Sequence, residues 1–210
     1  MVKLPKSPGI RRMREEGAEE TVLREGTLLF RVFFQGGEHP VAWDELRSFG
    51  PLTSARFDHH PSPQRDHPDL GILYGAREVK TCVAEVFQQT RNINLRRRGP
   101  WLAGFELARD VRLLDLLGRW PTRMGASTEI SSGRRSVVRG WSKDIHAAYP
   151  QLHGVLYGSS MNAYREAVAL YERGASALPT RPVLHEPLTH PGLRDDLERF
   201  KDDLGFGLIP

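Results

Sequence analysis

The stretch DLGILYGAREVKTCVAEVF, residues 69–87, contains a strand pattern followed at once by a helix pattern. Its first part, LGILYGA, is a short apolar run ending in a Tyr-Gly turn, and it predicts a buried strand. Its second part predicts an amphipathic helix whose apolar stripe is Val79, Cys82, Val83, Val86 and Phe87. At about 100° per residue, Glu85 falls outside this stripe, on the face of Glu78 and Thr81. Taken alone, this position is typical of a solvated glutamate.

Composition places the chain among ordinary globular proteins. Its 210 residues suit one domain, and 39% hydrophobic with 27% charged residues is enough to bury a core. No run approaches the roughly 18 apolar residues of a membrane span, and the N-terminal residues do not resemble a signal peptide, so we expect a cytoplasmic protein without a membrane partner. The single cysteine, Cys82, excludes an internal disulfide and a cysteine-based zinc site, and its place on the stripe predicts a core residue.

The formal net charge of +4 raises the question of nucleic-acid binding. Short arginine runs stand at residues 96–98 and 134–135, but most basic residues are dispersed among acidic ones. No zinc finger, basic zipper or RNP aromatic pattern accompanies them. Runs of this kind are usually solvated loops, so the sequence disfavours direct nucleic-acid binding and favours an acidic partner or a phosphorylated small molecule.

Charge and hydrophobic patterns divide the chain into a tail and one domain. Residues 1–25 are charged and hold few apolar anchors, so we expect a disordered or loosely docked tail. Residues 26–210 are expected to form a single domain that includes a C-terminal amphipathic helix.

Strand and helix patterns interleave along this domain. Apolar runs predict strands at residues 27–34, 101–107, 111–117 and 152–160. Helices are predicted at 135–150, at 162–174 with Asn162 as its cap, and at 194–204 with a stripe of Leu193, Leu197, Phe200 and Leu204. Because the strands are short and the loops long, we predict an α+β fold with a mixed, partly split sheet and flanking helices.

Arg31 is the one charge inside the apolar strand LFRVFF. A charge at a strand centre costs free energy unless it is paired, so Arg31 is predicted to meet a carboxylate or a bound anion. A purely structural salt bridge between Arg31 and Glu85 is an equally good interpretation. Arg56, which precedes Phe57 in another short extended piece, is a second candidate anion ligand.

Polar side chains also stand at the ends of two predicted strands. Tyr74 and Tyr157 each precede a glycine, and Ser159 follows two residues after Tyr157. Polar residues at such positions commonly line a cleft. A cleft with arginines, a tyrosine, a serine and a glutamate suits a phosphorylated ligand that carries a ring. Tyr157 itself is more typical of the core, and we do not include it in the predicted site.

The loop DHHPSPQRDHPD, residues 58–69, is rich in metal-binding side chains, namely Asp58, His59, His60, Asp66, His67 and Asp69. Adjacent histidines point in different directions in an extended chain, and no HExxH or similar spacing is present. The pattern therefore favours a flexible loop over a metal site.

The order FRV…ARF…LYGA…CVAEVF…HGVLYGSS resembles the RES domain, a family named for an arginine, a glutamate and a serine. The matching residues are Arg31 in LFRVFF, Glu85 in AEVF and Ser159 in YGS, and the likeness extends over roughly residues 27–175. Four weak motifs in the right order make a moderately specific pattern.

This resemblance implies a fold similar to that of ADP-ribosyltransferases and a single RES-like catalytic domain. Most RES proteins are toxins of bacterial toxin–antitoxin pairs, so it also implies an Xre-type helix-turn-helix antitoxin as the partner. The implied activity is cleavage of the nicotinamide–ribose bond of NAD⁺ by hydrolysis or phosphorolysis. The alternatives are transfer of ADP-ribose to a protein acceptor and a non-enzymatic RES-like binding protein.

The resemblance also implies a role for each site residue. Glu85 would stabilise the oxocarbenium-like cation that forms when the bond breaks, and no metal is needed. Arg31 and Arg56 would bind the pyrophosphate of NAD⁺. Tyr74 would stack on the nicotinamide ring. Ser159 would hydrogen-bond the ribose or orient Glu85.

Overall fold

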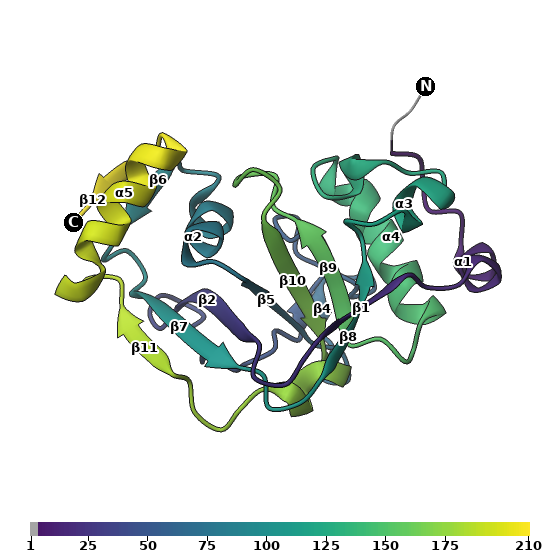
Figure 1. Ribbon diagram of the computed structural model, residues 1–210, viewed down its shortest axis with the longest axis horizontal. Helices are drawn as coiled ribbons and strands as arrows, with labels where there is room; N and C mark the ends of the chain where they lie inside the picture. Colours follow the sequence, from purple (N-terminus) through teal and green to yellow (C-terminus); the bar gives the residue numbers. More distant parts are fainter. Residues whose placement is uncertain (1–3) are drawn as a thin grey trace.

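The computed structural model describes residues 4–210, and the first three residues of the predicted tail lie outside this range. An eight-stranded sheet runs through the molecule in the order β1-β8-β9-β10-β5-β2-β7-β11 (Figure 1). Its strands are β1 (Glu20–Leu23), β2 (Leu28–Phe34), β5 (Ile72–Ala76), β7 (Pro100–Glu106), β8 (Val111–Asp115), β9 (Gly154–Gly158), β10 (Glu166–Tyr171) and β11 (Leu184–Pro187).

Two small sheets and several helices complete the fold. β3 (Phe49–Gly50) pairs with β4 (Arg65–Asp66), and β6 (Asn92–Asn94) pairs with β12 (Gly207–Ile209). The helices are α1 (Ile10–Glu16), α2 (Val79–Phe87), α3 (Trp120–Arg123), α4 (Arg135–Ala148) and α5 (Arg194–Leu204), with 3-10 turns η1 (Thr128–Ile130), η2 (Glu172–Ala177) and η3 (Pro191–Leu193). None of the described helices is long and apolar enough to cross a membrane.

The large sheet is mixed, which confirms the predicted α+β class. β8 and β9 run parallel, and the other neighbouring pairs are antiparallel. The sheet is also partly split, as predicted. β2 pairs with β7 along its whole length, but it meets β5 in the single register pair Phe30↔Ala76. Beyond this pair the two strands diverge.

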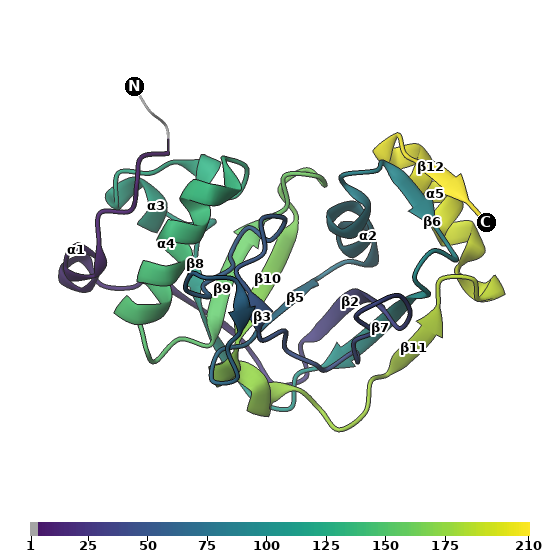
Figure 2. The ribbon, with the colours of Figure 1, turned by 180° about the vertical axis from the view of Figure 1, so that it is seen from behind.

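Alternating side chains divide between two apolar clusters, one on each face of the sheet. Val32 of β2 joins the cluster that holds Trp120 and Trp141, whereas Leu29 and Phe33 join the other. Both views show α1, α3 and α4 beside one end of the sheet and α2 and α5 beside the other (Figures 1 and 2).

Helix α2 has the predicted apolar face. Val83 is fully buried, and Cys82 is a core residue whose Sγ donates to the carbonyl oxygen of Phe30 at 3.0 Å. Burial raises the pKa of the Cys82 thiol to about 12, so it stays protonated near neutral pH. Thr81 is also fully buried, whereas Glu85 is half-buried rather than solvated.

The helix predicted over residues 162–174 is wrong. Residues 166–171 form β10, which lies between β9 and β5 and pairs with both. A central strand is buried on both faces and reads as a continuous apolar run, which a single sequence does not distinguish from a helix. Asn162 does not cap a helix there, because its amide donates to Thr81 Oγ1 at 2.9 Å.

The N-terminal segment differs from the loosely docked tail that composition suggested. Residues 20–23 form β1 and pair with β8 at the edge of the large sheet. Met13 is fully buried, and its carbonyl oxygen accepts a 2.6 Å hydrogen bond from the Tyr149 hydroxyl. A few well-placed anchors are enough to fix a charged segment, and composition averages over them.

Candidate active site

A pocket of about 450 Å³ opens where β2 and β5 diverge. If the antiparallel ladder continued from Phe30↔Ala76, Val32 would lie opposite Tyr74 and Phe34 opposite Ile72. Instead, these four residues line the pocket. The split in the sheet is therefore what creates the cavity, and its volume lies in the range typical of small-molecule sites.

The pocket wall is strongly basic. Its charged lining residues are Arg31, Arg47, Arg56, Arg98, Arg135 and Glu85. Five guanidinium groups against one carboxylate favour a ligand with more than one negative charge. The structure thus brings together four of the five predicted site residues, Arg31, Arg56, Tyr74 and Glu85, around one pocket.

Glu85 projects from α2 into this pocket, and two side chains hold its carboxylate. Ser159 donates its hydroxyl to Glu85 Oε1 at 2.6 Å, and Gln88 donates its amide to Oε2 at 3.3 Å. Gln88 Oε1 in turn accepts from Arg135 at 2.6 Å. The glutamate is therefore an oriented group at a cavity wall rather than a freely rotating surface side chain.

Ser159, the fifth predicted site residue, is fully buried and does not line the pocket. It contacts Glu85 instead. Its Oγ accepts from the backbone N–H groups of Met161 and Asn162, both at 3.2 Å. These two bonds leave the hydroxyl hydrogen directed at Glu85. Ser159 therefore contacts the carboxylate of Glu85 and not the cavity itself.

The turn after β9 fixes the position of Ser159. Ala163 and Tyr164 adopt left-handed backbone conformations, with φ of 45° and 61°. The Tyr164 ring folds back over Gly158, where an added Cβ would come within 2.4 Å of it. Only glycine fits beneath this ring, which explains the glycine of the YGS motif.

Arg31 does not form the salt bridge with Glu85 that the sequence allowed. Its Nη1 donates to the carbonyl oxygens of Trp43 at 2.7 Å and Glu45 at 2.9 Å. Burial lowers the pKa of Arg31 to about 10, while the nearby charges of Glu45 and Asp44 oppose this change. Arg31 therefore remains a cation near neutral pH and is held by backbone oxygens.

Arg56 lines the pocket, and its Nη1 donates to the carbonyl oxygen of Gly133 at 2.5 Å. Burial is the main cause that lowers its pKa, and the neighbouring charge of Arg135 adds to the effect. Glu85 acts in the opposite direction and favours the charged form. Arg56, Arg135 and Glu85 all line the same pocket.

Tyr74 lines the pocket from β5, and its hydroxyl is buried without a hydrogen-bond partner among residues 4–210. Burial raises the pKa of Tyr74 far above its usual value, so the hydroxyl remains a donor. Tyr157 is buried, as predicted for a core residue, yet it also lines the pocket. A tyrosine at a strand end before a glycine is the sequence signal for both residues, although only Tyr74 was predicted as a site residue.

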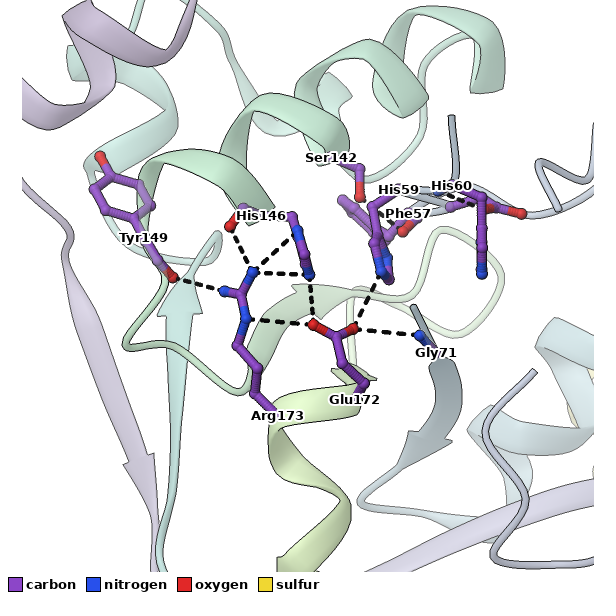
Figure 3. A network of polar contacts seen from close by, with 10 residues as sticks. Phe57, His59, His60, Gly71, Ser142, His146, Tyr149, Glu172 and Arg173 are labelled. Atoms are coloured by element: carbon purple, nitrogen blue, oxygen red, sulfur yellow. Dashed lines mark hydrogen bonds and ion pairs between the residues drawn. The ribbon is translucent and has the colours of Figure 1, made fainter. Parts of the chain in front are cut away.

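The histidine-rich loop, which was predicted to be flexible, is buried at residues 58–60 and at His67, whereas residues 61–66 are exposed. Asp58 and His60 are fully buried, and they form a pair in which Oδ1 and Nδ1 are 2.5 Å apart. The His59 ring stacks between His60 and His146 of α4, with ring centroids 5.0 Å and 4.2 Å away (Figure 3). The six predicted ligand residues are therefore not gathered around one point.

A different trio, His59, His146 and Glu172, places candidate ligand atoms within 4.8 Å of one another. Glu172 accepts from His146 Nε2 at 2.7 Å (Figure 3). Arg173 Nη2 lies 2.8 Å from that same ring nitrogen, and Arg173 Nε lies 3.3 Å from Glu172 Oε1. The cation of this cluster is a guanidinium group, so the donor set does not fit a metal ion.

Comparisons with known proteins agree with this architecture. A family model for the RES domain matches residues 28–207. A chain of the crystal structure of the M. tuberculosis MbcT–MbcA toxin–antitoxin complex superimposes with a TM-score of 0.58 at 16% sequence identity. The match covers 90% of this chain and 96% of that one. No curated protein matches the sequence significantly. The structural likeness concerns the fold, and the family match covers most of the sequence, so the chain belongs to the RES domain family.

Proposed function

We propose that this protein is a RES-type toxin that cleaves the nicotinamide–ribose bond of NAD⁺ by hydrolysis or phosphorolysis. The observation that carries the proposal is the 2.6 Å hydrogen bond from Ser159 to Glu85 at the wall of a basic pocket. It joins two residues that identify the family pattern and holds a carboxylate toward a cavity of suitable size. Family membership supports the reaction class.

The reaction breaks the bond between ribose C1′ and the nicotinamide nitrogen. The electron pair leaves with the ring, so the positively charged nicotinamide group departs as a neutral molecule and positive charge develops on the ribose. The carboxylate of Glu85 stabilises this charge, and its effect is larger because Ser159 and Gln88 hold it in place beforehand. Water, which releases a proton to the solvent, or a phosphate oxygen then forms the new bond to C1′. Ser159 acts by positioning and is not a nucleophile.

The remaining lining residues bind the rest of the dinucleotide. Arg31 and Arg56 match the pyrophosphate, because a guanidinium group binds phosphate oxygens through parallel N–H donors. Tyr74 offers a ring for stacking against nicotinamide. The unpartnered Tyr74 hydroxyl gains an acceptor when a polar ligand fills the pocket.

We further propose that the protein is inhibited by an antitoxin partner. The superimposed M. tuberculosis chain comes from a toxin–antitoxin complex, which supports such a partner here. An Xre-type helix-turn-helix protein is the specific proposal, on the basis of the family resemblance. Co-expression of this protein with a candidate Xre-type antitoxin, followed by co-purification, tests the proposed partner. The absence of a complex would contradict the proposal.

The direct test of the activity is nicotinamide release from NAD⁺ by the purified protein, with and without phosphate in the buffer. We expect nicotinamide release. The second product identifies the acceptor: ADP-ribose shows that it is water, and phosphorylated ADP-ribose shows that it is phosphate. ADP-ribose attached to a protein would instead establish a transferase. Binding of ADP-ribose without any release would leave two options, a transferase that awaits its protein acceptor or a RES-like protein that only binds.

A further inference from the structure

Arg47 lines the pocket although no sequence motif marks it. Its backbone forms a two-way bridge with Ile72 at the start of β5, with N···O distances of 2.9 Å and 3.1 Å. The charge of Arg47 acts on the buried Tyr74 hydroxyl, whose pKa it lowers against the effect of burial. Arg47 and Tyr74, the tyrosine that we assign to the ligand site, both line the pocket.

Two protein oxygens hold the guanidinium group of Arg47 in place. One terminal nitrogen donates to the carbonyl oxygen of Phe49, and the other donates to Asp58 Oδ2 at 2.9 Å. The side chain of Arg47 remains 22% exposed, whereas that of Asp58 is fully buried. A guanidinium group has further N–H donors, so these two contacts leave some for a ligand in the pocket.

Asp58 uses both of its carboxylate oxygens within the protein. Besides Arg47, Oδ2 accepts the backbone N–H of Leu52 at 2.7 Å, and Oδ1 accepts from the backbone and ring of His60. Burial raises the pKa of Asp58, but the His60 hydrogen bond and the Arg47 charge outweigh it and hold the pKa well below its usual range. Asp58 is therefore charged near neutral pH and fixed in position.

The same carboxylate organises the loop that closes one side of the pocket. Arg47 begins this loop and Leu52 lies at its middle, and both contact Asp58. Leu52, Ser54, Ala55 and Arg56 all line the cavity. Burial of a charged carboxylate costs free energy even when four donors bind it. In this protein the buried carboxylate of Asp58 fixes the loop that lines one side of the pocket.

We propose that Arg47 is a further substrate-binding residue of the pocket, which contacts a phosphate group of the ligand, and that Asp58 is its positioning residue. This inference rests on the proposed NAD⁺ site. A residue that only stabilised the fold would not need to direct a basic group into the cavity. Arg47 supplies charge beyond that of Arg31 and Arg56, which suits a ligand with two linked phosphates.

The test measures calorimetric binding of ADP-ribose, which carries the pyrophosphate, to the wild type, Arg47→Met, Asp58→Asn and the double variant. Nicotinamide release from NAD⁺ is followed in parallel. Arg112→Met is the matched control, because Arg112 forms a 2.7 Å salt bridge with Glu20 but does not line the pocket. Thermal unfolding and circular dichroism establish that each variant is folded.

We expect each single variant to weaken ADP-ribose binding by about tenfold or more, as for the loss of a charged hydrogen bond. Because Asp58 acts through Arg47, the double variant should bind no more weakly than Arg47→Met alone. The control should bind like the wild type. In NAD⁺ cleavage, Arg47→Met should raise KM more than it lowers kcat.

Unchanged binding by Arg47→Met would overturn the proposal, as would a wild type that does not bind ADP-ribose. Losses that multiply in the double variant would overturn the positioning role of Asp58. If Asp58→Asn does not fold, Arg47→Lys replaces it in the test. Lysine keeps the charge but does not bridge Phe49 O and Asp58 Oδ2 as the guanidinium group does. Binding of ADP-ribose by Arg47→Lys as tight as that of the wild type would refute the positioning role of Asp58. A wild type that binds ADP-ribose without releasing nicotinamide would refute the proposed function and leave this inference standing.

Discussion

The hydroxyl of Ser159 lies 2.6 Å from Glu85 Oε1, although the two residues are 74 positions apart in the sequence. One residue comes from helix α2 and the other from the turn after β9. Two backbone N–H groups bind the serine oxygen and direct its hydrogen to the carboxylate. This relationship leads to the first prediction.

Replacement of Ser159 by alanine should lower kcat for NAD⁺ cleavage and change KM little, because Ser159 orients Glu85 without lining the pocket. The change also removes the acceptor of two backbone donors and should lower the free energy of unfolding by about 1–3 kcal/mol. Steady-state kinetics and urea unfolding measure the two effects. Ser142→Ala is the control, since this buried serine also donates one hydrogen bond, to Phe57 O at 2.7 Å. Equal kcat in Ser159→Ala and Ser142→Ala would contradict the role of Ser159.

Arg31 should matter for both binding and folding. Arg31→Met removes hydrogen bonds to Trp43 O and Glu45 O, and we expect a loss of about 1–3 kcal/mol in the free energy of unfolding together with a higher KM for NAD⁺. Arg77→Met provides the comparison, because Arg77 likewise donates to a backbone oxygen, that of Leu28, but lies outside the pocket. A KM for Arg31→Met equal to that of Arg77→Met would mean that Arg31 is structural only.

The His59–His146–Glu172 cluster should make stability depend on pH. Burial lowers the pKa of His59 from an ordinary value of 6.5 to about 4, so between these values the unfolded chain binds a proton that the folded chain does not. Stability is therefore fully present above about pH 6.5 and falls as the pH drops toward 4, by about 3 kcal/mol at most.

The cluster also contains a carboxylate with a lowered pKa. Burial raises the pKa of Glu172, but the 2.7 Å hydrogen bond from His146 and the approach of His59 Nε2 to 3.4 Å outweigh burial and hold the pKa well below its usual value. Its contribution is present above about pH 4.5 and is lost in more acidic solution. Urea unfolding at a series of pH values measures both effects. In His59→Gln the slope between pH 4 and 6.5 should flatten, and an unchanged slope would show that another group is responsible.

Chelation should leave the enzyme unaffected. Arg173 already places a guanidinium group against His146 and Glu172, so we expect no change in nicotinamide release with EDTA and no rise in the unfolding temperature with added zinc. Arg173→Ala is the companion variant, because it removes the guanidinium group that contacts His146 and Glu172. Zinc-dependent stabilisation of wild-type protein would show that the cluster accepts a metal despite Arg173.

Much of the architecture was predictable from local patterns. The spacing of apolar residues identified α2 and the position of Glu85 outside its stripe, and the end of α4 before Pro150 followed from proline chemistry. β10 was missed because its burial depends on two neighbouring strands that are remote in sequence. The docking of residues 10–23 likewise depends on partners, such as Tyr149 and β8, that no local pattern reveals.

The site shows the same division. Arg31 stood out as a charge inside an apolar strand, Arg56 as a charge in a short extended piece and Tyr74 as a tyrosine at a strand end. Glu85 has an ordinary helix position and stood out only through the family pattern, and all four residues line the pocket. Arg47 and Arg135 escaped notice because an arginine in a loop or at a helix start is ordinary in sequence. Their importance arises from contacts with Asp58 and Gln88, which only the folded chain brings together.

We propose that the carboxylate of Glu85, held by Ser159, stabilises the positive charge that develops on ribose as the nicotinamide–ribose bond of NAD⁺ breaks. The most direct measurement is kcat for nicotinamide release by wild-type protein and by Glu85→Gln, which keeps the shape and removes the charge. We predict a rate lower by about 10²–10³-fold in the variant, with the fold and ADP-ribose binding retained. A Glu85→Gln variant that releases nicotinamide as fast as the wild type would contradict the account.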